Sequence, residues 1–315
     1  MRARTQDVRA VTRLAPAKVN LHLGVHAEKD ARGYHRVDSV MVALDLADVV
    51  TVEPAGSLSV TCVPPAGFPE QSNTAFRAAS LLAAALGRPA DVRVTLEKHI
   101  PEQSGMGGSS SDAASVLLAL CELWGLDPLD ARVAKAARAV GADVPFFLDP
   151  RPTLLAGAGD VPREKFPPLD GVPVALVRPE GPGVSTPAAY REFDRLHDSA
   201  ADPAPICSAL RASDARAVAG LLENNLGPVA RRLLPEVDRV RGWLSAREGV
   251  VACQVTGSGS CVFAVCESRA AAEAAAAEAR LVSAGADGRP RWWSRAAVTI
   301  SSPSQIPVAK ARKLC

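Results

Sequence analysis

A loop of glycines and serines between a predicted strand and a predicted helix constrains this chain more than any other stretch. Residues 101–115 read PEQSGMGGSSSDAAS. Before the loop, apolar residues alternate with polar ones over 92–96, which predicts a strand. After it, the apolar residues of 116–124 have helical spacing, and Gly125 suits the first position past a helix end. The sequence therefore predicts the order strand, glycine loop, helix.

The loop is suited to binding an anion. Gly105, Gly107 and Gly108 allow backbone N–H groups to converge at a helix N-terminus, and the hydroxyls of 109–111 add donors. We expect Asp112 to cap this helix. No lysine follows the glycines, and the spacing GxGxxG is absent, so neither the Walker A pattern nor the dinucleotide-binding pattern applies. The loop predicts phosphate binding; the alternative is a flexible turn before a serine-capped helix.

The composition is that of an ordinary folded protein, with 48% hydrophobic and 22% charged residues. Lys and Arg number 36 against 34 Asp and Glu, a balance that argues against a nucleic-acid or membrane binder. The first 18 residues are charged and contain no apolar segment. Seven cysteines form no CxxC pair in a chain too large to need disulfides. We therefore expect reduced thiols and a cytoplasmic location.

The length of 315 residues predicts two domains. The segment 160–173, rich in proline and charge, is the predicted junction, which divides the chain into 1–160 and 161–315. Alternation over the first 60 residues predicts strands, and the second domain is expected to end in a loose tail after residue 302. Further predicted helices are 73–85, 129–140, 209–222, 236–246 and 268–281, and further predicted strands are 174–177, 250–255 and 261–265.

Four polar features outside the loop can carry chemistry. Lys18 and Asn20 lie on the polar face of an alternating strand, where a lysine is most often simply solvated. Asp143 precedes Val-Pro-Phe-Phe, and a carboxylate among apolar neighbours needs a partner, which a helix N-terminus or an ion pair would also supply. TGSGS at 256–260 predicts either a close backbone approach to a ligand or a plain hairpin turn.

Six segments, taken in order, resemble the family of 4-diphosphocytidyl-2-C-methyl-D-erythritol kinases within the galactokinase, homoserine, mevalonate and phosphomevalonate kinase superfamily. The glycine loop and the TGSGSC segment mark the superfamily, and the others are more specific to this family. The segments are LAPAKVNLHLGV (14–25), GYHRVDSVMVALDLAD (33–48), PEQSGMGGSSSDAAS (101–115), GADVPFFL (141–148), PGVST with Tyr190 (182–190) and TGSGSC (256–261).

The resemblance implies a two-domain α+β kinase with its active site between the domains. The N-terminal domain, 1–160, would resemble the ribosomal protein S5 domain 2 fold and bind ATP, and the C-terminal domain, 161–315, would be ferredoxin-like and lie on the substrate side. The implied reaction phosphorylates the 2-hydroxyl of the cytidylylated methylerythritol with ATP and Mg²⁺, in the non-mevalonate route to isoprenoids. The implied partner is this small molecule, with no nucleic acid or membrane, for a monomer or homodimer. The ligands of Mg²⁺ stay open.

Site residues follow by motif matching. Lys18 and Asp143 stand where the family has its catalytic pair. Many family members have glycine where this chain has Ser109, and we expect the loop to tolerate the change. The resemblance implies nucleotide binding by Asn73, Lys98, Pro101, Glu102, Gln103, Ser104, Gly105, Met106, Gly107, Gly108, Ser109, Ser110 and Ser111, and substrate binding by Asn20, Tyr34, His35, Tyr190, Gly257 and Ser258.

Two alternatives remain open at this point. One is another small-molecule kinase of the superfamily, of mevalonate or homoserine type, against which GYHRVDS and Tyr190 argue. The other is a non-catalytic nucleotide or metabolite sensor, which would be expected to lack the pair Lys18 and Asp143.

Overall fold

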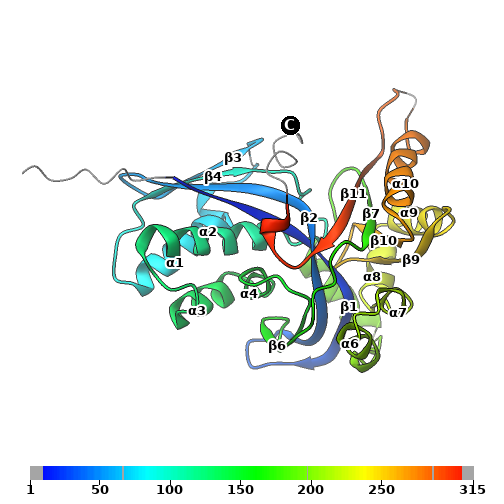
Figure 1. Cartoon of the computed structure of the whole chain (residues 1–315), viewed down its shortest axis with the longest axis horizontal. Helices are drawn as coiled ribbons and strands as arrows, with labels where there is room; N and C mark the ends of the chain where they lie inside the picture. Colours follow the sequence, from blue (N-terminus) through cyan, green and yellow to red (C-terminus); the bar gives the residue numbers. More distant parts are fainter. Residues whose placement is uncertain (1–9, 66, 197, 286, 307–315) are drawn as a thin grey trace, which may run out of the picture.

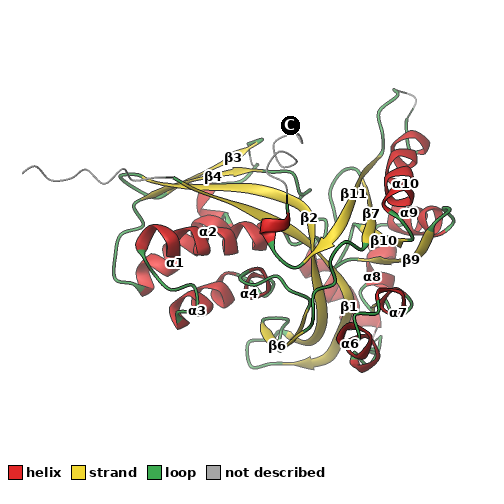
Figure 2. Cartoon of the chain, in the orientation of Figure 1, coloured by secondary structure: helices red, strands yellow, loops and turns green. Residues whose placement is uncertain are grey.

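The computed structural model describes residues 10–65, 67–196, 198–285 and 287–306. Within these residues, eleven strands form one mixed sheet. Helices gather in two separate layers, one against each half of the sheet, so that the molecule consists of two lobes (Figure 1, Figure 2).

The N-terminal lobe is built on two long antiparallel strands, β1 (Val11–Lys29) and β2 (His35–Pro54). Their pairing register shifts on either side of the stretch 18–20 in β1, and such bulges re-aim the side chains beside them. Helices α1 to α4 lie along one face of this sheet (Figure 1). The other elements of the lobe are β3 (Ser59–Val63), a 3₁₀ turn (Glu70–Ser72), α1 (Thr74–Ala85), β4 (Val92–Glu97), α2 (Gly108–Trp124), α3 (Ala131–Val140), α4 (Val144–Phe147), β5 (Thr153–Ala156) and β6 (Val161–Lys165).

The local signals of this lobe specify its helix ends. The side chain of Asn73 accepts a hydrogen bond of 2.9 Å from the backbone N–H of Ala75 and so caps α1. Gly125 ends α2 in the left-handed conformation, with φ of 64°. The order strand, glycine loop, helix is confirmed, since β4 leads through the loop into α2.

The C-terminal lobe has the strand order expected of a ferredoxin-like domain. Apart from the two-residue β8, which pairs with β1, its four strands follow the spatial order β11-β7-β10-β9. Helices lie between the first two of these strands in sequence, and one helix lies between the last two. The elements are β7 (Pro173–Pro179), α5 (Thr186–Leu196), α6 (Ala204–Arg211), α7 (Ala215–Ala219), β8 (Glu223–Asn224), α8 (Gly227–Leu233), α9 (Glu236–Ser245), β9 (Val250–Val255), β10 (Val262–Cys266), α10 (Arg269–Val282) and β11 (Trp292–Ile300).

Strand β11 joins the two halves of the sheet, because it pairs with β7 along most of its length and with β2 at its end. The sequence analysis identified no strand there. The predicted division between residues 160 and 161 falls within the hairpin of β5 and β6, whereas the connection from β6 to β7 lies inside the predicted junction 160–173. We propose that the C-terminal lobe begins between β6 and β7.

Two of the predicted segments differ from the sequence-based expectation. The helix predicted over 209–222 is divided into α6 and α7, because Ser213 has a φ of 54° and Asp214 starts α7 by accepting from the N–H of Ala217. Beyond residue 302, Pro303–Gln305 forms a 3₁₀ turn with a capping box, and Ile306 is buried in the core. The remainder of the expected tail, 307–315, lies outside the described residues.

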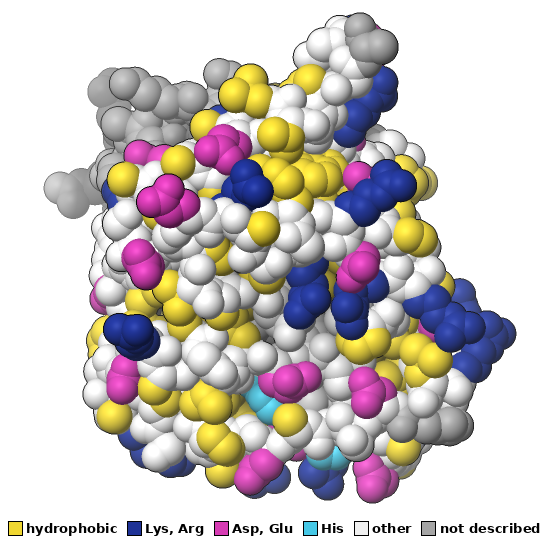
Figure 3. Space-filling model, turned by 90° about the vertical axis from the view of Figure 1, so that its right-hand side faces the viewer, with side chains coloured by type: hydrophobic (Ala, Val, Ile, Leu, Met, Phe, Trp, Pro, Cys, Tyr) yellow, Lys and Arg dark blue, Asp and Glu magenta, His cyan; other side chains and the backbone are white. Residues whose placement is uncertain are grey.

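The core consists mainly of aliphatic side chains and alanines, as the 4% aromatic content requires. Helix α10 shows how alanine contributes: Ala272, Ala275, Ala276 and Ala279 are buried along one stripe, at a spacing of three and four residues. On the face shown in Figure 3, acidic and basic side chains are interspersed, in agreement with the net charge of +2. Among the described residues, no helix combines the length and the hydrophobicity needed to cross a lipid bilayer.

The buried stripe of α10 can be tested by adding one charge to either side of the helix. Ala272 is fully buried and Ala274 is exposed, so each is replaced with glutamate, which preserves helix propensity. We expect Ala272→Glu to lower the free energy of unfolding by about 3 kcal/mol, because it buries an unpaired carboxylate. Ala274→Glu should stay within about 0.5 kcal/mol of the parent. Chemical denaturation followed by circular dichroism measures both, and equal losses would contradict this packing.

Candidate active site

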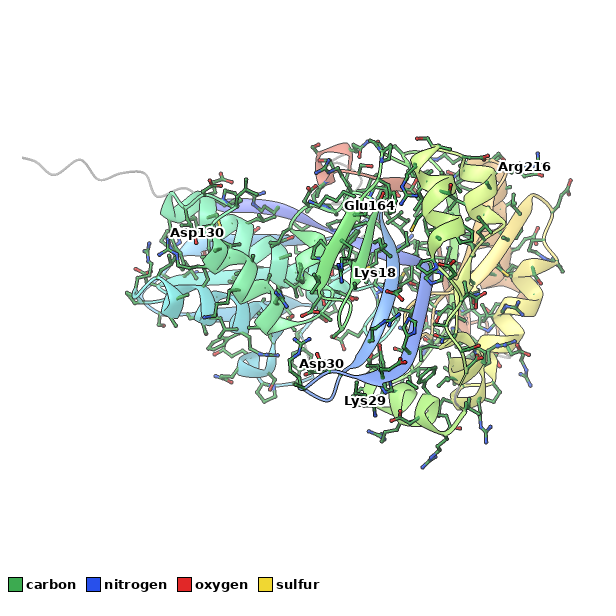
Figure 4. The ribbon with its side chains drawn as sticks, turned by 90° about the horizontal axis from the view of Figure 1, so that it is seen from below. Lys18, Lys29, Asp30, Asp130, Glu164 and Arg216 are labelled. Carbon is green, nitrogen blue, oxygen red and sulfur yellow. The ribbon has the colours of Figure 1, made fainter. Side chains whose placement is uncertain are left out.

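A cavity of about 340 Å³ lies between the two lobes. Its lining comes from β1, β2, the glycine loop, the start of α4, the turn between β5 and β6, α5 and the turn between β9 and β10. Figure 4 shows Lys18 near the middle of the molecule, whereas Asp130 lies in the N-terminal lobe and Arg216 at the far end of the C-terminal lobe. The cavity therefore brings together segments that are distant in sequence.

Lys18 and Asp143 meet in this cavity. The Nζ atom of Lys18 lies 3.5 Å from Oδ2 of Asp143, and the side-chain exposures are 3% and 30%. Asp143 occupies the N-cap position of α4, but its side chain makes no capping hydrogen bond. The partner that the sequence requires for Asp143 is therefore a lysine of β1, and the carboxylate stays accessible from the cavity.

Asn20 connects this pair to the C-terminal lobe. Its Oδ1 atom accepts from Nζ of Lys18 at 2.6 Å, from the backbone N–H of Gly257 at 2.9 Å and from the hydroxyl of Thr256 at 3.1 Å. Its Nδ2 atom donates to the hydroxyl of Ser39 at 2.9 Å. With every polar atom of its amide bonded, Asn20 holds Lys18 in place.

The glycine loop passes through a space too narrow for side chains. Gly105 and Gly107 have φ of 77° and 74°. A Cβ atom on Gly105 would lie 2.1 Å from the carbonyl oxygen of Thr256, and one on Gly107 would lie 2.9 Å from Phe147 and 3.0 Å from Cγ of Lys18. The loop backbone is thus pressed against Lys18 on one side and the C-terminal lobe on the other.

Helix α2 begins directly at the end of this loop. Gly107 is its N-cap, and the N–H of Ser111 already bonds the carbonyl oxygen of Gly107 at 2.9 Å. Ser109 lies inside the helix, so its position does not require positive φ and serine replaces glycine without strain. The first N–H groups of α2 have no partner within the helix, and with the helix dipole they form a site for anionic oxygens next to Lys18.

Three charged side chains, Lys98, Asp48 and Asp112, connect the entry of the loop to helix α2. Lys98 donates to both Asp48 and Asp112, and Asp48 also accepts from the backbone N–H groups of His99 and Ile100. Asp112 therefore does not cap α2 as we expected; it lies in the second turn, 2% exposed, and bonds Lys98 instead. Lys98 does line the cavity, but its ammonium group is already occupied by two carboxylates.

This cluster shifts the pKa values of its members. Burial raises the pKa of Asp112 to about 7, with Asp48 adding to the rise and Lys98 opposing it. Burial by itself would lower the pKa of Lys98, but the charges of Asp112 and Asp48 outweigh it, so that this pKa is raised above its ordinary value. The ammonium group is consequently charged throughout the physiological range.

The TGSGS segment forms the turn between β9 and β10, closed by a bond of 3.0 Å from the N–H of Thr256 to the carbonyl oxygen of Cys261. Gly257 and Ser258 also line the cavity. The side chain of Asn224 donates to the carbonyl oxygen of Gly257 at 2.9 Å and fixes the turn. The segment is therefore a hairpin turn, two residues of which face the cavity.

Of the matched aromatic residues and His35, only Tyr190 lines the cavity. Burial, followed by the charge of Asp143, raises the pKa of Tyr190 to about 12. His35 is buried, its ring centroid is 5.4 Å from that of Tyr190, and its Nδ1 atom lies 2.6 Å from the carbonyl oxygen of His26. Tyr34 is 60% exposed and lies outside the cavity lining.

Most of the matched residues line one cavity, although a few do not. Met106 and Ser111 are fully buried, and Asn73 caps α1. Tyr34 and His35 also lie outside the lining. Those that line it are Lys18, Asn20, Lys98, Pro101, Glu102, Gln103, Ser104, Gly105, Gly107, Gly108, Ser109, Ser110, Asp143, Tyr190, Gly257 and Ser258.

Several residues of the site were not singled out in the sequence. Ser39 and Asp48 belong to the segment 33–48 and Thr186 follows PGVS, so these motifs could have pointed to them. Leu226 also lines the cavity, but a leucine at the start of a helix carries no local signal of this role.

Comparison with known proteins gives two matching family models. The model described as GHMP kinases N terminal domain matches residues 73–149, and the model described as GHMP kinases C terminal matches residues 206–282. The first match includes the glycine loop and Asp143, and the second includes the TGSGS turn.

Curated relatives cover most of the chain. A 4-diphosphocytidyl-2-C-methyl-D-erythritol kinase of Thermus thermophilus is 42% identical over 83% of this chain and 91% of its own length, and one of Salinibacter ruber is 36% identical over 83% and 92%. A crystal structure of 4-(cytidine 5'-diphospho)-2C-methyl-D-erythritol kinase has 34% identity, covers 93% of this chain and 100% of its own, and has a TM-score of 0.70. Homoserine kinase of Cytophaga hutchinsonii, at 18% identity and a TM-score of 0.67 over 95% of this chain and 98% of its own, shares the fold.

The raised pKa of Asp112 predicts a pH-dependent stability. The folded state binds this proton more tightly than the unfolded chain, whose value is 3.8, so the contribution of the group is fully present below pH 3.8 and is lost as the pH rises through about 7. Asp112→Asn resembles the neutral acid and removes this loss. We expect the difference in melting temperature between Asp112→Asn and the parent to increase from pH 5 to pH 8.

The matched control for this measurement is Asp130→Asn. The hydrogen bond from Arg132 holds the pKa of Asp130 at about 2, so this carboxylate does not titrate between pH 5 and pH 8. Its variant should differ from the parent by a constant amount in differential scanning calorimetry. A constant difference for Asp112→Asn as well would refute the raised pKa.

Proposed function

This chain belongs to the GHMP kinases and, within them, to the 4-diphosphocytidyl-2-C-methyl-D-erythritol kinase family, and we propose that it transfers the γ-phosphoryl group of ATP to the 2-hydroxyl of 4-diphosphocytidyl-2-C-methyl-D-erythritol. The products are the 2-phosphate and ADP. The observation that carries this proposal is the contact of Lys18 with Asp143 in a cavity shared by the glycine loop and Tyr190.

Phosphoryl transfer depends on positioning and on charge stabilisation more than on covalent chemistry. The N–H groups at the start of α2 and the loop 101–108 bind the phosphates of ATP. Gly105 lets the loop backbone pack against Thr256, and Gly107 lets it pack against Phe147 and Lys18, so that these N–H groups are held in place.

Asp143 accepts the proton of the substrate hydroxyl and aims its oxygen at the γ-phosphorus. The ammonium of Lys18, 3.5 Å away, orients this carboxylate. Lys18 also lies beside Gly107 and stabilises negative charge that develops on the transferred group. Asn20 accepts a hydrogen bond from this ammonium group and holds it in position for both roles.

The cytidine end of the substrate packs against the aromatic residues. Tyr190 and His35 form a tilted ring pair with an interplanar angle of 37°, and Tyr34 follows at the surface. Stacking a base on an aromatic ring contributes about 1–3 kcal/mol. Since stacking does not distinguish cytosine from uracil, hydrogen bonds around His35 provide that discrimination.

Mg²⁺ accompanies ATP in this proposal, where it neutralises phosphate charge. Among the described residues, no group of three His, Cys, Asp or Glu side chains is arranged to hold a metal ion. The roles assigned above use only the side chains and the backbone of the protein. A cytoplasmic location and the state of monomer or homodimer stay predictions.

An ADP-release assay tests the substrate. With ATP and Mg²⁺, we expect turnover of the cytidylylated methylerythritol and none above background for mevalonate or homoserine. Faster turnover of mevalonate or homoserine would identify another member of the superfamily. ATP binding with no turnover of any of the three compounds would favour a sensor.

The catalytic pair is tested with Asp143→Asn and Lys18→Met. Asp143→Asn should lower kcat by about 10²- to 10⁴-fold, the usual range for losing a positioned base, with little change in ATP affinity. Lys18→Met should have a comparable effect, because it leaves Asp143 unpaired. Asp149→Asn and Lys165→Met are matched controls, since this lysine–aspartate pair lies outside the cavity. Full turnover by Asp143→Asn would eliminate the general-base role.

A further inference from the structure

Arg178, near the end of β7, is a buried charge without a carboxylate partner. It is 6% exposed, and among the described residues no Asp or Glu oxygen lies within 4.0 Å of its guanidinium nitrogens. Instead it donates to three backbone carbonyl oxygens: Nε to Pro179 at 3.0 Å, Nη1 to Glu102 at 2.9 Å and Nη2 to Gly181 at 2.5 Å.

The three hydrogen bonds of Arg178 form only when the carbonyl groups are correctly placed. A guanidinium group taken out of water needs hydrogen bonds for its donors, and its planar fork satisfies several carbonyl groups only if they are correctly placed. The three carbonyls come from two segments that are more than 70 residues apart. One is the entry to the glycine loop, and the other, 179–185, is the last residue of β7 with the connection to α5. Arg178 therefore fastens these two segments together.

The two segments are also in direct contact. A Cβ atom on Gly183 would lie 1.9 Å from the carbonyl oxygen of Gln103, so the backbones touch here. Gln103 itself has a φ of 50°, which is unusual for a residue with a side chain. A strained residue at the entry of the loop persists only if its surroundings hold it, and Arg178 bonds the residue immediately before it.

Each segment leads to a different part of the cavity. Beyond Glu102, the chain enters Gly105 and the start of α2, on the nucleotide side. Beyond Gly181, it enters α5, which places Thr186 and Tyr190 in the lining on the substrate side. A displacement of one segment at the Arg178 contact therefore displaces the other.

We propose that Arg178 is a positioning residue that couples the nucleotide side of the cavity to the substrate side, so that each ligand strengthens binding of the other. This inference rests on the proposed function, which supplies the two ligands. By linkage, the coupling is the same whichever ligand is added first.

The test measures the affinity for a non-hydrolysable ATP analogue by calorimetry, with and without saturating 4-diphosphocytidyl-2-C-methyl-D-erythritol. We expect the wild type to bind the analogue about fivefold or more tightly with the substrate present, the lower end of usual coupling. Arg178→Met should bring this ratio close to one. Arg178→Lys keeps the charge and some of the donors, and should retain part of the ratio.

Two further variants separate coupling from stability. Arg280→Met removes an arginine that bonds the backbone of Ser294 away from the cavity, and should leave the ratio unchanged. Gly183→Ala places a methyl group against the carbonyl oxygen of Gln103 and so disturbs the contact between the two segments. It should lower the ratio, and it provides a test even if Arg178→Met does not fold.

Equal ratios in the wild type, Gly183→Ala and whichever Arg178 variants fold would overturn the coupling role, as would a ratio of one in the wild type. If the wild type turns over the substrate and the variants keep the wild-type affinity ratio, only the role of Arg178 is refuted. A wild type without turnover refutes the proposed function, and the coupling with it.

Discussion

The site depends on the burial of one ammonium group. Lys18 has a side-chain exposure of 3%, and a charge at this depth is tolerated only with close partners. Its partners are Asp143 at the start of α4 and the amide oxygen of Asn20, while its backbone N–H bonds the carbonyl oxygen of Met106. Lys18 therefore holds β1, α4 and the glycine loop in a fixed relation, and Asn20 extends that relation to the C-terminal lobe.

The glycine loop is held in place from both lobes. From the N-terminal lobe, Lys98 and its two aspartates secure its entry and the first turns of α2. From the C-terminal lobe, Arg178 bonds the carbonyl of Glu102, and the TGSGS turn packs against Gly105. A binding site made of backbone N–H groups works only if these groups are aimed beforehand, so such support suits a loop without a Walker lysine.

Local signals predicted much of the fold. Asn73 and Gly125 delimit helices because a cap depends on residues within one turn. The role of Asp112 was missed for the opposite reason: its partners stand at 48 and 98, and no pattern near 112 indicates them. Strand β11 was likewise missed, since its place between β2 and β7 depends on pairing with strands far away in the chain.

The sequence by itself determined which chemistry is available: a glycine loop before a helix, a lysine and an aspartate in characteristic motifs, and two tyrosines. Only the tertiary structure decided which charges pair and which rings face the cavity. His35 is buried against Tyr190 while its neighbour Tyr34 is 60% exposed, although both belong to one motif. The physical reason is that burial and ion pairing arise from contacts between distant segments, whereas sequence patterns report interactions between residues a few positions apart.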